Sequence, residues 1–141
     1  MKHTIFLAAS MNFYREVVAI EKQLIEKGFT VILPVSAQMM KAQNDFEVSH
    51  FKGVQTKEDR QQFIQTNFKN IAKSDSILVI NNEKNGVQGY IGPNVLMEIG
   101  LAFYLHKNIY IWNQIEANAS CKEELDTFDV KYINKDVDKI L

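Results

Sequence analysis

Glu98 is the residue of this sequence whose neighbours most strongly indicate a catalytic role. It interrupts an otherwise apolar run, 95–102, which follows Gly92 and Pro93, a pair typical of a helix start. Its neighbours at helical spacing, none of them cationic, are Asn94, Leu101, Ala102 and Leu105. Because burial of a lone carboxylate is costly, the pattern indicates a catalytic nucleophile or general base.

A purely structural role for Glu98 is the alternative. The helix dipole favours an acidic residue near a helix N-terminus, and an acid at the third helical position can complete a capping box. With Pro93 as the first helical residue, Glu98 falls in the second turn, beyond that position. The dipole therefore accounts for an acid in this segment but not for one in this apolar register.

The composition bounds the class of protein. Apolar residues make up 46% and charged residues 23% of the chain, as in soluble globular proteins, and we expect a single domain over residues 1–141. A formal net charge of -1 favours neither a nucleic acid polymer nor an anionic membrane surface as a partner. The single Cys121 and the scattered histidines have no metal-ligand spacing, and no dinucleotide fingerprint is present, so we expect no metal and no cofactor. No apolar stretch has the length of a signal peptide core or a membrane span, which predicts a soluble, cytoplasmic protein.

Strand-like and helix-like segments alternate along the chain, which is the pattern of an α/β fold with a mostly parallel sheet. We predict strands at residues 4–8, 29–33, 76–80 and 108–112, with a weak edge strand at 130–133. We predict helices at 13–27, 57–73, 93–105 and 122–127, with a turn or two of helix at 37–43. These elements form one doubly wound domain, in which a five-stranded sheet of flavodoxin-like order 2-1-3-4-5 carries helices on both faces.

The predicted site lies at the carboxyl ends of these strands, where ligands bind in open α/β sheets. Two connections that follow strand ends, residues 35–56 and 81–92, are longer than a compact fold requires, which is typical of functional loops. Glu98 lies about one turn into the helix after the third strand and faces the same edge. The predicted position of Glu98 therefore agrees with a catalytic role for its carboxylate.

Three segments, Ser74–Ile80, Tyr90–Gly92 and Glu98–Ala102, resemble in order and spacing the nucleoside 2-deoxyribosyltransferase superfamily, which also includes nucleotide N-glycoside hydrolases. The likeness extends over about residues 4–113. It implies that Glu98, in a Glu-hydrophobic-Gly-x-Ala motif, attacks the anomeric carbon of a deoxyribosyl group and displaces the base. A second base or water then resolves the glycosyl-enzyme. A nearby carboxylate suits this chemistry because the transition state resembles an oxocarbenium ion.

The sequence departs from the family pattern in three places. Many members carry an Asp eight residues ahead of Asp75, where this chain has Asn67, which cannot supply a proton to a departing base. Six residues before the Glu, transferases often carry Asp and nucleotide hydrolases Ser, where this chain has Gly92. The glycine-rich first loop of the family is Ala8-Ala9-Ser10 here. The alternative function is therefore a nucleotide- or nucleoside-binding protein of the same fold without efficient catalysis.

Several residues near Glu98 are candidates for contact with a nucleoside or nucleotide. They are Ala8, Ser10, Asn12, Asn67, Asn81, Tyr90, Gly92 and Asn94. Structural roles are alternatives for most of them: Ser10 or Asn12 is a suitable cap for the first helix, and Asn94 for the helix of Glu98. An aromatic residue such as Tyr90 also commonly packs a loop onto a helix.

Assembly is the last expectation. The helix of Glu98 continues through Ile99, Leu101, Phe103, Tyr104 and Leu105, and is apolar on more faces than one sheet can cover. This predicts a homodimer or higher homo-oligomer, which the family resemblance also implies. The alternative is that the tail, residues 114–141, folds back over the surplus apolar surface.

Overall fold

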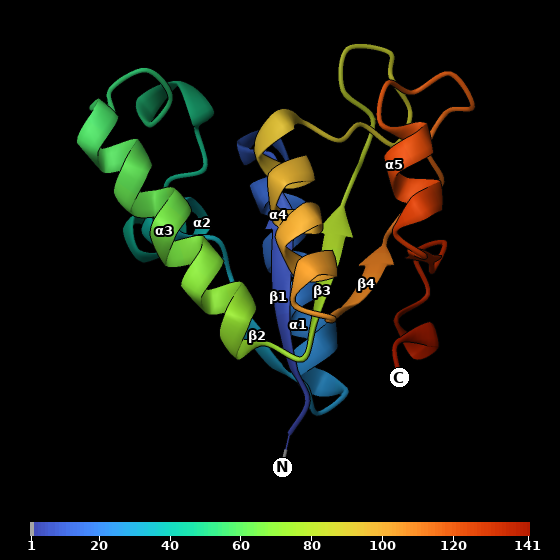
Figure 1. The fold of residues 1–141 in the computed structure, drawn as a ribbon. Helices are drawn as coiled ribbons and strands as arrows, with labels where there is room; N and C mark the ends of the chain where they lie inside the picture. The colour runs from blue at the N-terminus through green and yellow to red at the C-terminus, as the bar shows by residue number, and fades with distance from the viewer. Residues whose placement is uncertain (1) are drawn as a thin grey trace.

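The computed structural model describes residues 2–141, which form one twisted sheet with helices on both faces (Figure 1). The strands are β1 (Thr4–Ala9), β2 (Thr30–Ile32), β3 (Ser76–Ile80), β4 (Asn108–Ile111) and β5 (Lys131–Tyr132). All neighbouring strands are parallel, and their order is β2-β1-β3-β4-β5. The predicted sheet and its order are confirmed.

The helices are α1 (Tyr14–Glu26), α2 (Val35–Gln43), α3 (Lys57–Lys73), α4 (Pro93–Tyr104) and α5 (Lys122–Thr127). Short 3-10 helices are η1 (Met11–Phe13), η2 (Val48–His50) and η3 (Val137–Lys139). One core, on the face of the sheet that includes Leu7 and Leu78, packs against α1, α2 and the C-terminal segment. The other core, on the face that includes Phe6 and Val79, packs against α3, α4 and α5.

The strand lengths follow from position in the sheet. β3 lies between β1 and β4 and is buried at every residue, as its continuous apolar sequence predicts. The two edge strands, β2 and β5, are shorter than their apolar segments suggest because each pairs on one side only. Asp75 sets where β3 begins, since its Oδ2 accepts a hydrogen bond of 2.8 Å from the backbone N–H of Thr4.

Two helix starts place the side chains of the site. α4 begins directly after Gly92, with Pro93 in its first turn, so Glu98 lies in the second turn as predicted. α3 begins with a reciprocal capping box between Thr56 and Asp59, whose two hydrogen bonds are both 3.0 Å. The segment that leads to α3 is held down by the buried side chain of Phe51.

The long connections lie at the end of the sheet to which the strands point (Figure 1). β1 and β3 are in register there, with Ala9 opposite Ile80, so the segments that follow them begin at the same level. The connection after β3 is stiffened by a two-way backbone pairing between Lys84 and Val87. A search of residues 2–141 finds no helix that is long and apolar enough to span a membrane.

Candidate active site

A cavity of about 640 Å³ opens at the carboxyl ends of β1 and β2. Its walls come from the residues after β1, the start of α2, the inner face of α3 and the first two turns of α4. The volume lies within the usual range for small-molecule sites. The cavity therefore lies where ligand binding is expected in an open parallel sheet.

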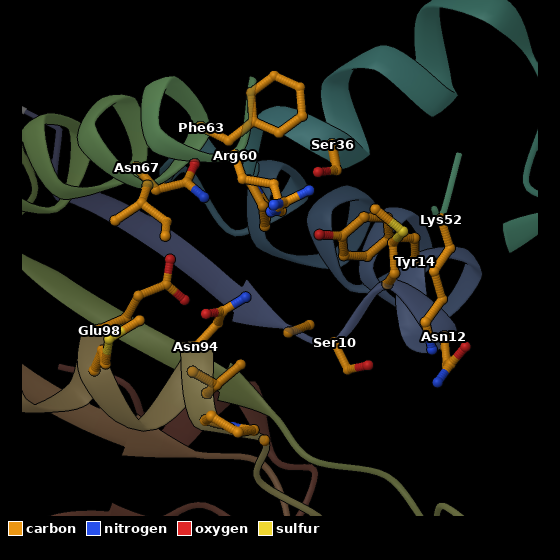
Figure 2. A pocket seen from close by; sticks show the side chains of 18 of the residues that line it. Ser10, Asn12, Tyr14, Ser36, Lys52, Arg60, Phe63, Asn67, Asn94 and Glu98 are labelled. Atoms are coloured by element: carbon orange, nitrogen blue, oxygen red, sulfur yellow. The ribbon is translucent and has the colours of Figure 1, made fainter. Parts of the chain in front are cut away.

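Glu98 reaches this cavity from α4 (Figure 2). Its side chain is only 7% exposed, and within residues 2–141 no hydrogen bond or ion pair engages its carboxylate. Burial raises the pKa of Glu98 from 4.5 to about 8. The group is therefore mainly protonated at neutral pH, and it must lose that proton before it can attack a substrate.

Tyr14, in the first turn of α1, is absent from the predicted site residues. Its ring is part of the core beneath α1, and its hydroxyl points into the cavity (Figure 2). Burial raises the pKa of Tyr14, the nearby charge of Glu98 raises it further, and a hydrogen bond with Ser36 opposes the shift. The hydroxyl therefore stays protonated and serves as a hydrogen-bond donor that faces the same space as Glu98.

Asn67 and Asn94 line the cavity from α3 and α4 (Figure 2). The Oδ1 of Asn67 accepts a hydrogen bond of 3.0 Å from the backbone N–H of Val35, which ties the start of α2 to α3 and leaves the Nδ2 group free for a ligand. Asn94 makes no capping hydrogen bond at the start of α4, so its amide is free to bind a ligand. Both residues thus line the cavity, and their contact with a ligand stays a prediction.

Tyr90 and Gly92 form one unit on the wall of the cavity. Lys84 Nζ lies 4.7 Å from the centroid of the Tyr90 ring on one side. A Cβ atom placed on Gly92 would lie 3.3 Å from the Tyr90 hydroxyl oxygen, which is tighter than nearly all such contacts. A side chain at position 92 would therefore crowd the Tyr90 hydroxyl.

Ser10 and Asn12 also line the cavity, but the expected helix cap is wrong. Neither side chain caps α1, because the chain leaves β1 through the 3-10 helix η1, in which Ser10 O accepts a hydrogen bond of 3.0 Å from Phe13 N–H. Both side chains are therefore available to a ligand.

Two predicted contact residues, Ala8 and Asn81, lie outside the cavity. Ala8 is fully buried on the α4 side of the sheet, and the next residue along the strand, Ala9, lines the cavity instead. Asn81 is fully buried as well; its Nδ2 donates to Asn113 O and its Oδ1 accepts from Asn113 N–H, both at 2.8 Å. Asn81 therefore joins the ends of β3 and β4 and has no polar atom to spare for a substrate.

The cavity also contains cationic side chains from the long connections and from α3, namely Lys52, Arg60 and Lys84. Sequence periodicity gives no sign of them because they lie in irregular segments or at a helix start. Metal-ligating groups are not gathered in this way: no cluster of three or more His, Cys, Asp or Glu residues in the described chain is arranged to hold a metal ion.

No family model matches the sequence, and no curated protein sequence matches it. Several solved structures are similar in fold, including the following two. A 2-deoxyribosyltransferase from Bacillus psychrosaccharolyticus superposes with a TM-score of 0.55 and 19% identity, over 77% of this chain and 70% of that chain. The Clostridium botulinum CMP N-glycosidase BcmB superposes with a TM-score of 0.51 and 19% identity, over 92% of this chain and 87% of that chain. The resemblance inferred from the sequence is thus confirmed at the level of fold.

Proposed function

We propose that this protein cleaves or transfers at the N-glycosidic bond of a (deoxy)nucleoside or nucleoside 5′-monophosphate, with Glu98 as the nucleophile. The observation that carries the proposal is the Glu98 carboxyl group, which is buried, free of protein partners within residues 2–141 and directed into the cavity. The fold relatives support the reaction class, since one is a deoxyribosyltransferase and the other a CMP N-glycosidase.

The reaction proceeds by two displacements at the anomeric carbon. A Glu98 carboxylate oxygen forms a bond to C1′ while the bond from C1′ to the base nitrogen breaks, and the electron pair of that bond leaves with the base. Water or a second base then attacks C1′ and gives up a proton to the departed base, the ester bond to Glu98 breaks, and the carboxylate is restored. Which acceptor reaches C1′ decides between hydrolysis and transfer.

Donors in the cavity stabilise the departing base. The Tyr14 hydroxyl and the Nδ2 group of Asn67 are placed to donate hydrogen bonds to the substrate. Because the pKa of Tyr14 is raised, its hydroxyl acts as a donor and not as a base. Such hydrogen bonds lower the barrier where they strengthen as charge develops on the leaving group.

A binding protein without turnover is the second candidate. It is favoured by Asn67, because an amide that already holds Val35 N–H has no acidic proton to give to the base. In that case the cavity binds the nucleoside or nucleotide and Glu98 remains a neutral hydrogen-bonding group.

The test is incubation with a panel of nucleosides and 5′-monophosphates, with and without a free acceptor base, followed by chromatography of the released base. The matched variants are Glu98→Gln, which keeps the shape of the side chain, and Glu26→Gln, an exposed site on α1. We expect base release or exchange that falls at least about a thousandfold in Glu98→Gln and is unchanged in Glu26→Gln. Binding without turnover would support the second candidate, and full activity of Glu98→Gln would refute the nucleophile.

A further inference from the structure

The charges of the cavity are unevenly matched. Three cationic side chains line it, those of Lys52, Arg60 and Lys84, while Glu98 is the one acidic side chain among the described lining residues. Since burial raises the pKa of Glu98 to about 8, that single acid does not balance the cations at neutral pH. An uncharged nucleoside gives the cations nothing to bind, whereas an anionic substrate does.

Arg60 keeps most of its donors free. One guanidinium N–H bonds to Gln55 O at 2.9 Å, which fixes the direction of the side chain, and the remaining N–H groups of the fork are unused. The nearby carboxylate of Asp59 accepts from Thr56 N–H in the capping box and forms no ion pair with Arg60. The guanidinium is therefore oriented and uncompensated.

Lys52 and Lys84 approach from separate segments. Lys52 follows the buried Phe51, which anchors its backbone, and Lys84 belongs to the paired turn 84–87 and lies against the Tyr90 ring. No ion pair within residues 2–141 involves either lysine or Arg60. Three cations without ion-pair partners, each from a different segment, therefore line one cavity. Phosphate sites in proteins usually have this composition.

Lys52 and Arg60 lie apart from Glu98 in the cavity (Figure 2). Arg60 and Asn67 are seven residues apart on α3, which corresponds to about 10 Å along the helix. None of the cations contributes to the pKa shift of Glu98, whose cause is burial. A substrate that reaches both ends must therefore carry its negative charge some distance from the anomeric carbon.

We infer that the cations lining the cavity, Lys52, Arg60 and Lys84, bind the phosphate of a nucleoside 5′-monophosphate, which is the substrate in preference to the free nucleoside. In such a molecule the sugar ring and C5′ separate the phosphate from C1′, as the distribution of charges in the cavity requires. This inference rests on the proposed function and narrows its substrate class.

The test is isothermal titration of the Glu98→Gln variant, which blocks turnover, with each nucleoside and its 5′-monophosphate. We expect the monophosphate of the preferred base to bind at least about tenfold more tightly than its nucleoside. This difference in affinity should decrease at high salt, because salt screens the interaction between the phosphate and the cations. Adding Arg60→Gln or Lys52→Gln should reduce monophosphate affinity about tenfold each and leave nucleoside affinity unchanged. Lys69→Gln, at an exposed position of the same helix, is the matched control and should change neither.

Ribose 5-phosphate separates the two proposals. If nucleosides bind and release base as well as their monophosphates do, the phosphate inference is overturned and the proposed function stands. If ribose 5-phosphate binds in an Arg60-dependent manner but no nucleoside or nucleotide loses its base in the parent protein, the proposed reaction fails and the phosphate site is supported. Absence of binding by any phosphorylated probe overturns the inference.

Discussion

Substitution of Glu98 by Gln should stabilise the folded protein, and by an amount that depends on pH. The carboxyl group is 7% exposed and has no ion-pair or hydrogen-bond partner in the described chain, so its charged form is penalised in the folded state and not in the unfolded state. Gln has nearly the same shape and carries no charge at any pH. The variant removes the penalty without opening a cavity.

The size and the sign follow from proton linkage. The pKa of Glu98 is about 8 when folded, against 4.5 for an unperturbed Glu, so between these pH values the folded protein holds a proton that the unfolded chain has lost. Stability of the parent protein therefore falls as the pH rises through this window, by about 1.4 kcal/mol per pH unit. From about pH 5 to about pH 7 the free energy of unfolding of Glu98→Gln should gain about 3 kcal/mol over the parent, and above about pH 8 the difference should level off.

Urea unfolding followed by circular dichroism, at half-unit pH steps, measures this difference directly. Glu26→Gln, at an exposed site, supplies the baseline for the same chemical change, and the slope must be specific to position 98. A stability difference between Glu98→Gln and the parent that stays flat from about pH 5 to about pH 8 would refute the raised pKa and, with it, the claim that the carboxyl group lies buried without a partner.

Further predictions concern activity and assembly. The kcat/KM of base release should rise about tenfold per pH unit up to about pH 8, as Glu98 ionises in the free protein, and a pH-independent rate would contradict this order of events. Tyr14→Phe should lower kcat/KM about tenfold by removal of one donor, with an unchanged unfolding midpoint as evidence that only the hydroxyl matters. Gly92→Ala should weaken substrate binding several-fold, an effect that disappears in a Tyr90→Ala background when measured as a double-mutant cycle. Light scattering should give about twice the chain mass of 16.3 kDa, and Tyr104→Glu should restore the single-chain mass; a parent protein of single-chain mass would reject the dimer.

The dimer prediction rests on apolar surface that the chain itself leaves open. The C-terminal tail covers part of α4: the ring of Phe128 stacks on that of Phe103, with centroids 4.6 Å apart. Beyond this contact Met97, Phe103 and Tyr104 remain 47%, 45% and 76% exposed. The alternative of a covering tail is thus realised in part, and the remaining surface is what a second copy would bury.

The fold was predictable because its signals are local and redundant. The buried strand 76–80 is a continuous apolar run, and the Gly92–Pro93 pair marks the start of α4 to the residue. The edge strands were less predictable, since the length of β2 or β5 depends on a neighbour that the local sequence does not encode. Helix capping at Ser10 failed for a similar reason, because the intervening 3-10 helix leaves no sequence periodicity.

The site was predictable where a residue sits on a regular element. Glu98, Asn94 and Asn67 project from helices whose inner faces can be worked out by spacing, and all three line the cavity. The prediction that Ala8 lines the cavity was wrong because alternate residues of a strand face opposite sides of the sheet, and Ala8 faces the other side. The prediction for Asn81 was wrong because its side chain bonds to Asn113, a residue far along the chain.

The residues that sequence reasoning missed escaped it for two physical reasons. Tyr14 buries its ring in the core and extends its hydroxyl into the cavity, so an apolar pattern describes only half of it. Lys52 and Lys84 line the cavity because of where their loops lie. These loops are fixed by the buried Phe51 and by the paired turn 84–87. Such roles emerge only when tertiary contacts are known.

The departures from the family pattern gain a different meaning in the structure. Gly92 looks in the sequence like the loss of a polar group, yet a side chain at this position would crowd the Tyr90 hydroxyl. Asn67 looks like the loss of an acid, yet its amide holds the start of α2 and so positions Ser36, the partner of Tyr14. Each change is thus connected to a hydroxyl-bearing residue that lines the cavity, Tyr90 in one case and Ser36 in the other. A buried carboxyl group without a partner is costly to keep in such a cavity unless it is used, and this cost favours the enzyme over the binding protein.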